Sequence, residues 1–226
     1  MIKPQRLNAN CDLDSLRQLR QALERFGALT ETAWVDTRAR FFEYRLEAGE
    51  HFLQAGEVAQ FGGFVVAGAL REYFITWEGQ EFNKNFSLTG NFTGSLFDLI
   101  TAEPSTASIQ ALTPTKLLVI RFDDLLELYN RHREWERVGR LLAESLFLLK
   151  ARREWEFMTL SAEQRYLRLI QNEPELETKI PQYHLASYLG INSVSLSRIR
   201  RRLGQPKLRG ASLHKPGQGD EANQEV

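Results

Sequence analysis

The chain has 226 residues, of which 42% are hydrophobic and 11% aromatic, enough for a large core and for one or two globular domains. Its 29 basic side chains equal its 29 acidic ones, and its apolar runs are far shorter than the roughly 18 residues that span a bilayer. The start of the chain has no secretory apolar stretch, so we expect a cytoplasmic protein with no membrane partner. The single cysteine, Cys11, excludes an internal disulfide and any cluster that needs several thiolates from one chain. The four histidines lack ordinary metal-ligand spacing, and we expect neither a metal nor another cofactor.

The balanced charge hides an uneven distribution along the chain. Residues 1–177 carry 21 basic and 26 acidic side chains, and residues 216–226 add three acids. Residues 178–215 hold no acid and eight basic side chains, which are Lys179, Arg198, Arg200, Arg201, Arg202, Lys207, Arg209 and Lys215. A positive block of this kind indicates a polyanionic partner, against the alternative of a solvated basic tail.

The first predicted element is an amphipathic helix over residues 12–34, capped by Asp12 or Asp14. Short runs rich in Phe, Val, Ile and Tyr then extend to Arg121, separated by turn residues. These runs predict strands at residues 41–46, 61–67, 69–76, 81–88, 108–112 and 116–120. Many short strands with frequent turns predict a small antiparallel β barrel or jelly roll.

After Arg121 the pattern becomes helical. A long helix is predicted over residues 134–157, with a 4-3-4 stripe formed by Val138, Leu142, Ser145 and Leu149. Val138, Leu142 and Leu149 are therefore the candidate contacts of a dimer, and the alternative is a helix packed on its own barrel. The whole chain is predicted to be an α+β protein.

The segment from Gln182 to Leu203 fits a helix-turn-helix. Ala186 supplies the small residue where the two helices cross, Gly190 can take a positive φ in the turn, and Asn192 or Ser193 can cap the second helix. The outward face of this helix would enter the major groove of double-stranded DNA. The candidate base contacts on it are Ser193, Val194, Ser197, Arg198 and Arg201, and the candidate phosphate contacts are Arg200, Arg202, Lys207 and Arg209. A plain helical hairpin is the alternative.

A glycine-punctuated barrel, a long helix and a C-terminal helix-turn-helix occur here in the order found in the Crp/Fnr family of bacterial transcription regulators, which the chain resembles over about residues 20–205. The segment LEAGEHFLQAGEVAQFGGFVVAGALREYF (46–74) looks like the family's opening strands, with glycines matching Gly49, Gly56 and Gly68. TPTKLLVI (113–120) looks like its closing strand. The resemblance implies a cyclic-nucleotide-binding-like barrel, a homodimer paired through the long helix, and DNA as partner, with RNA polymerase a further candidate partner.

The chain departs from this family at the segment that holds the nucleotide. Its cAMP-binding members have a Gly-Glu pair and an Arg-Ser/Thr-Ala triplet where this chain has Gly94-Ser95 and Ser105-Thr106-Ala107. A desolvated phosphate without its arginine loses on the order of 2 to 5 kcal/mol, which argues against cAMP as the ligand. The best-known relatives also have Arg and Glu at the positions of Ser193 and Val194, so a different DNA site is expected.

Several polar residues of the barrel are candidates for lining an effector pocket. They are Arg71, Tyr73, Lys84, Asn85, Ser95, Ser105 and Thr106. Strict alternation places Phe82, Lys84 and Phe86 on one face of their strand and Asn83, Asn85 and Ser87 on the other, so Lys84 is alternatively an exposed residue.

These observations predict a sensor barrel with its N-terminal helix (1–122), linker and dimerisation helices (123–157), a DNA-binding domain (158–205) and a mobile tail (206–226) without clear wing strands. The expected function is effector-responsive transcription regulation, not catalysis. One alternative is a constitutive DNA-binding regulator whose barrel is only structural. A cupin-like metal enzyme is more remote, because His51 is the only histidine of the barrel.

Overall fold

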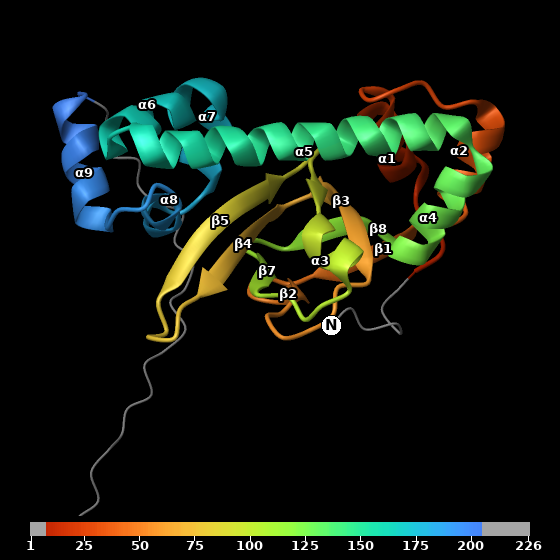
Figure 1. The fold of residues 1–226 in the computed structure, drawn as a ribbon, viewed down its shortest axis with the longest axis horizontal. Coiled ribbons are helices and arrows are strands. Elements are labelled where there is room, and N and C mark those ends of the chain that lie inside the picture. The colour runs from red at the N-terminus through yellow and green to blue at the C-terminus, as the bar shows by residue number, and fades with distance from the viewer. Residues whose placement is uncertain (1–7, 205–226) are drawn as a thin grey trace, which may run out of the picture.

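Two antiparallel sheets form the centre of the molecule in the computed structural model, which describes residues 8–204. One sheet has the order β1-β8-β3-β6 and the other β2-β7-β4-β5. Figure 1 shows the two sheets below the long helix. The strands are β1 (Phe42–Leu46), β2 (His51–Leu53), β3 (Phe61–Ala67), β4 (Ala69–Ile75), β5 (Glu81–Leu88), β6 (Phe92–Thr93), β7 (Ala107–Ala111) and β8 (Thr115–Arg121). The sheets enclose a core that includes Tyr44, Val65 and Leu117, and this jelly-roll barrel confirms the antiparallel class predicted from the short strands.

Gly68 shows why glycine separates β3 from β4. Its φ is +107°, and a Cβ there would lie 2.8 Å from the carbonyl oxygen of Pro114. Both the backbone conformation and the space therefore exclude a larger side chain. Gly49 and Gly56, the two other glycines that carried the resemblance, also have positive φ values.

A β-bulge at Lys84 corrects the strict alternation expected along β5. Glu72 pairs with Asn85 but Tyr73 pairs with Asn83, so Lys84 is an extra residue in its strand. The bulge turns Asn83 to the same side of the hairpin as Phe86, where both contact the C-terminal helices. Lys84 is thereby directed to Glu72, which its Nζ contacts at 2.5 Å.

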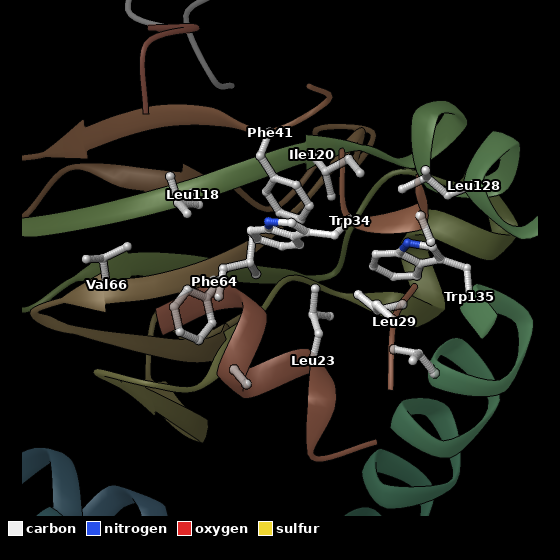
Figure 2. Packing of buried hydrophobic residues seen from close by; sticks show 14 residues of the cluster. Leu23, Leu29, Trp34, Phe41, Phe64, Val66, Leu118, Ile120, Leu128 and Trp135 are labelled. Carbon is white, nitrogen blue, oxygen red and sulfur yellow. The ribbon is translucent and has the colours of Figure 1, made fainter. Parts of the chain in front are cut away.

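Helices cover the outer face of the first sheet. The single helix expected over residues 12–34 is instead two, α1 (Leu13–Glu24) and α2 (Glu31–Arg38), because the chain breaks at residues 25–30. Asp12 caps α1 by accepting a hydrogen bond from the Ser15 amide. α4 (Phe122–Arg131) completes this layer, whose core gathers the aromatic and aliphatic side chains of Figure 2.

The long helix α5 (Arg133–Thr159) runs over the barrel and ends beside four shorter helices (Figure 1). These are α6 (Ala162–Asn172), α7 (Pro174–Lys179), α8 (Gln182–Tyr188) and α9 (Ser193–Arg202); a further short helix, α3 (Leu96–Thr101), follows β6. Besides the barrel core and the core of Figure 2, a third hydrophobic cluster joins Tyr166 and Leu196 of these helices to Ala69 and Phe86 of the barrel. The C-terminal helices and the barrel thus share one core. Four predictions fall outside the described residues. They concern the C-terminal tail, the absence of clear wing strands, Lys207 and Arg209.

Candidate nucleic-acid interface and effector cavity

The α8–α9 pair is held by a glycine turn. Gly190 has a φ of +70°, and a Cβ there would lie 2.8 Å from Cε1 of Phe157 at the end of α5. Asn192 caps α9 by accepting a 2.8 Å hydrogen bond from the Ser195 amide, and Ala186 is buried as the helix crossing requires. The direction in which α9 leaves the turn is therefore set by backbone conformation and by contact with α5.

The outer face of α9 is polar and positively charged. Val194, Arg198 and Arg201 are exposed, Ser193 is exposed at the start of the helix, and Ser197 is partly buried. Arg202 is exposed and forms an ion pair with Glu163 of α6. Arg198, Arg201 and Arg202 lie on one solvent-accessible surface, and of these three Arg202 has a carboxylate neighbour there.

The structure corrects one expected phosphate contact, Arg200, which is buried. Its side chain is 8% exposed and lies 3.4 Å from the carboxylate of Glu177 in α7. It follows Leu196 by four residues, which places it on the buried face of α9. Arg200 therefore joins α9 to α7 and is not presented to solvent.

The hairpin of β4 and β5 is bound to α8 through a buried polar cluster. Arg71 donates two hydrogen bonds to Oε1 of Gln110 and one of 2.5 Å to Glu81, and its Nη1 lies 3.4 Å from Nδ1 of His184. Asn83 Nδ2 lies 3.2 Å from the same Nδ1. Because both neighbours can only donate, Nδ1 must accept and the ring proton lies on Nε2. Burial, and then the Arg71 charge, lower the pKa of His184 to about 3.

α5 has two opposite apolar faces, and the predicted dimer face is partly used by the protomer itself. Val138 is fully buried in the protomer's own core, whereas Leu142 is partly buried beside a cavity next to the barrel. Leu149 is 45% exposed. The opposite face carries exposed or partly exposed apolar side chains in a 7-3-4-3 series, which are Leu141, Leu148, Ala151, Trp155 and Met158.

A cavity of about 400 Å³ lies between the barrel and the helices α3, α4 and α5. Its wall includes Gly62 of β3, Glu72 of β4, Asn85 of β5 and Leu142 of α5. Of the predicted pocket residues, Asn85 borders the cavity, whereas Lys84 does not line it but pairs with Glu72, which does. Arg71 borders it too, but its guanidinium is bound to Gln110 and Glu81.

The other predicted pocket residues lie outside the cavity wall. Tyr73 is bound to His51 through its hydroxyl group, Ser95 is buried at the start of α3, and Thr106 is exposed. Ser105 donates a 2.6 Å hydrogen bond to the buried carboxylate of Asp98. The place where cAMP-binding proteins of the resembled family carry arginine is thus occupied by a serine–carboxylate pair.

Two negative findings concern the described part of the chain. Within residues 8–204, no three His, Cys, Asp or Glu side chains are grouped as metal ligands. Over the same residues, no helix combines the length and the apolar character that crossing a membrane requires.

Comparisons with known proteins support the fold. Residues 43–132 match the family model of the cyclic nucleotide-binding domain. FixK2 from Bradyrhizobium japonicum has a similar structure, with a TM-score of 0.64 and 18% identity over 76% of this chain and 89% of that one. The c-di-GMP responsive global regulator CLP of Xanthomonas campestris gives 0.59 and 18% over 77% and 92%. The catabolite activator protein of Thermus thermophilus gives 0.52 and 23% over 81% and 86%. No curated protein matches the sequence significantly. Residues 43–132 are therefore similar to a cyclic nucleotide-binding domain, and the solved structures support the same jelly-roll fold with its long helix.

Proposed function

We propose that this protein is a homodimeric, DNA-binding transcription regulator of the Crp/Fnr type. The observation that carries the proposal is the exposed positive face of α9, where Arg198 and Arg201 project from a helix fixed by a glycine turn. Arginine can donate two hydrogen bonds to one guanine edge, and a helix of this kind fits the major groove. Binding to the chromosome would place the protein in the cytoplasm and beside RNA polymerase.

The outer stripe of α5 supports the dimer. Leu141, Leu148 and Trp155 recur every seven residues, and Ala151 and Met158 lie on the same face. A seven-residue repeat is the spacing at which two helices pack along their length. A second copy related by two-fold symmetry would bury this stripe against itself and present two α9 helices together.

The cavity supports an effector function. Glu72 and Asn85 face it from β4 and β5, while Arg71 and Asn83 on the same two strands contact α8. A ligand that shifts this hairpin would change the contact that positions the DNA-binding helices, provided that it binds one arrangement more tightly than the other. The Ser105–Asp98 pair argues against a cyclic nucleotide in this role.

The test is DNA binding by the full chain. Selection from random duplexes, followed by fluorescence anisotropy, should yield a preferred sequence. Replacing Arg198 and Arg201 together with alanine should weaken binding by about 100-fold, as the loss of two charged contacts to DNA implies. The matched control is Arg17→Ala, which removes an exposed, ion-paired arginine of α1, far in sequence from α9. This variant should leave DNA binding unchanged. Enrichment of no sequence, or equal effects of both variants, would reject the proposal.

The alternative, a constitutive regulator, predicts a different result when DNA affinity is measured with and without small molecules. In that case no small molecule bound in the cavity changes DNA affinity, because the barrel serves only as scaffold. A change of DNA affinity on adding metabolite extracts, lost when the cavity is filled by mutation, supports the effector-responsive form.

A further inference from the structure

We propose that the cavity between the barrel and α5 takes a neutral, mostly apolar small molecule that carries one hydrogen-bonding end. The inference rests on the proposed function, because this molecule would be the effector of the regulator. It names a ligand class that differs in charge from the nucleotides for which the domain family is named.

The size of the cavity suits a small ligand. Ile100 and Leu126 in its wall are 66% and 41% exposed, so a ligand could enter from solvent. The cavity of about 400 Å³ falls in the range of roughly 300 to 1,000 Å³ that holds small ligands.

The wall of the cavity is mainly hydrocarbon. α3 contributes Leu99, β7 contributes Ile109, α4 contributes Phe122 and Leu125, and α5 contributes Leu142 and Leu146. Water inside such a wall would find few polar partners, whereas an apolar ligand would gain from burial. The affinity is therefore expected to depend on the ligand's apolar surface.

The charged groups around the cavity supply no net positive charge to an anion. Two arginines border the cavity within the described residues, and each has a carboxylate partner: Arg71 lies 2.5 Å from Glu81, and Arg140 lies 2.6 Å from Glu144. Lys84 is neutralised by Glu72, which itself lines the wall. An anionic ligand would therefore find each of these cations already paired with a carboxylate, so the described wall favours a neutral ligand.

Most polar groups of the wall come from the strands. Asn85 and Ser87 come from β5, Glu72 from the paired β4, and Thr93 from β6, whereas Arg140 comes from α5. A ligand with one hydroxyl or amide group could bond to these strand residues while its apolar part lies against α4 and α5. Such a pattern of a few polar groups in an apolar wall fixes the orientation of a ligand.

Two fluorescent probes that differ mainly in charge test the ligand class directly. N-phenyl-1-naphthylamine is neutral, and 8-anilinonaphthalene-1-sulfonate carries the same ring system with a sulfonate. Titrated into the full chain, the neutral probe should saturate at one molecule per chain, and the sulfonate should bind about tenfold more weakly or worse. Excess cAMP should not displace the neutral probe.

Matched variants on α5 place the probe. Leu142→Trp fills the cavity and should weaken binding of the neutral probe by about tenfold. Phe147→Trp changes an exposed residue of the same helix that does not line the cavity, and binding should be unchanged. If circular dichroism shows that Leu142→Trp is unfolded, Gly62→Leu replaces it, because a Cβ at Gly62 meets no heavy atom within 4 Å.

The outcomes separate this inference from the proposed function. Preference for the sulfonate, displacement by cAMP, or unchanged binding in the filled-cavity variant would overturn the ligand class even if DNA binding is found. Loss of the DNA result with the probe results intact would reject the regulator function alone, since the probe titration contains no DNA.

Discussion

Ser105 stands where the cAMP-binding members of the resembled family carry an arginine. Its side chain donates to Asp98 Oδ2 at 2.6 Å and also contacts the backbone of Ala107, and both Ser105 and Asp98 are buried. A hydroxyl in this position compensates the burial of a carboxylate. The pair is thus a structural unit of the turn between α3 and β7.

Ser105→Ala should therefore destabilise the protein. It leaves the Asp98 carboxylate buried without this donor, which costs about 1 to 3 kcal/mol in the free energy of unfolding. Urea denaturation measures the loss. Thr106→Ala changes the exposed neighbour and should stay within about 0.5 kcal/mol of the parent; equal losses for both variants would show that the carboxylate does not need the hydroxyl.

Arg198 and Arg202 should differ in what they contribute on DNA. Arg198→Ala should cost about 1 to 3 kcal/mol and relax the preference at one guanine of each half-site, because the side chain is exposed on the outer face of α9. Arg202→Ala, at the end of the helix, should weaken all duplexes about equally. Anisotropy on matched and single-base-changed duplexes separates the two effects. If Arg198→Ala weakens every duplex by the same factor, it contacts phosphate only.

At the scale of elements, the outer stripe of α5 is the surface on which we propose that two copies meet. The Val138 side of the helix is already buried in the protomer's own core. Leu148 is 62% exposed and Trp155 47%. Both large side chains would be buried by a second helix.

Replacing Leu148 and Trp155 together with aspartate should convert dimers to monomers at micromolar concentration, with association weakened by about 100-fold or more. Size-exclusion chromatography with light scattering measures the mass. Leu149→Asp, an equally drastic change of a neighbouring exposed leucine off the stripe, should leave the dimer intact. A dimer that survives the double change but not Leu149→Asp would return the interface to the Leu149 side.

The junction between the β4–β5 hairpin and α8 should weaken in acid. The folded pKa of His184 is about 3 against an ordinary value of 6.5, so the unfolded chain binds the proton first as the pH falls below 6.5. Its contribution to stability is complete above 6.5 and is lost on acidification, by up to about 1.4 kcal/mol per pH unit. The groups that face the ring are Arg71 of β4, which is paired with Glu81, and Asn83 of β5.

His184→Gln cannot gain this charge and should flatten the dependence of unfolding free energy on pH between 6.5 and about 5, where the carboxylates stay ionised. Urea titrations at several pH values measure the slope. His132→Gln, which changes a histidine that pairs with Asp36 at the other end of the molecule, serves as the control for general histidine effects. Equal slopes in the parent and His184→Gln would show that the imidazole gains its proton without cost.

For the whole molecule, a dimer built on α5 presents two identical α9 helices. The preferred DNA site should then be two-fold symmetric, with half-sites roughly 34 Å apart. Binding should weaken steeply with salt, because arginines from both copies release counterions from the phosphates. Selected sequences and anisotropy over a salt series test both statements. An asymmetric site, or an affinity independent of salt, would contradict this arrangement.

Much of the architecture can be predicted from local sequence pattern. Where the prediction failed, the failure has a physical reason. The β3 and β5 bounds agree with the predicted runs, because β-branched and aromatic residues end there at turn glycines or polar turns. The bulge at Lys84 was missed because alternation carries no mark for one inserted residue. β2 and β6 were missed because three and two residues are too short to show a period.

The candidate DNA-binding segment could also be predicted in outline but not in every contact. Glycine, cap and charge marked the α8–α9 segment, and the spacing of four between Leu196 and Arg200 was a usable signal that Arg200 faces inward. Its partner Glu177 could not be foreseen, since it lies on another helix. The rotation of α5 could not be fixed either: a helix with apolar residues on two opposite sides does not tell which side meets the barrel.

Because α5 has two apolar faces, the same helix would contact both the ligand in the cavity and the second copy of the chain. One side closes the ligand cavity and the other would lie against the second copy, so a shift or rotation of the helix alters both at once. Mass action then ties the two equilibria together: if ligand binding favours association by some factor, association favours ligand binding by the same factor. The apparent ligand affinity of such a protein depends on its own concentration in the cell. Its abundance would accordingly set the threshold at which it responds.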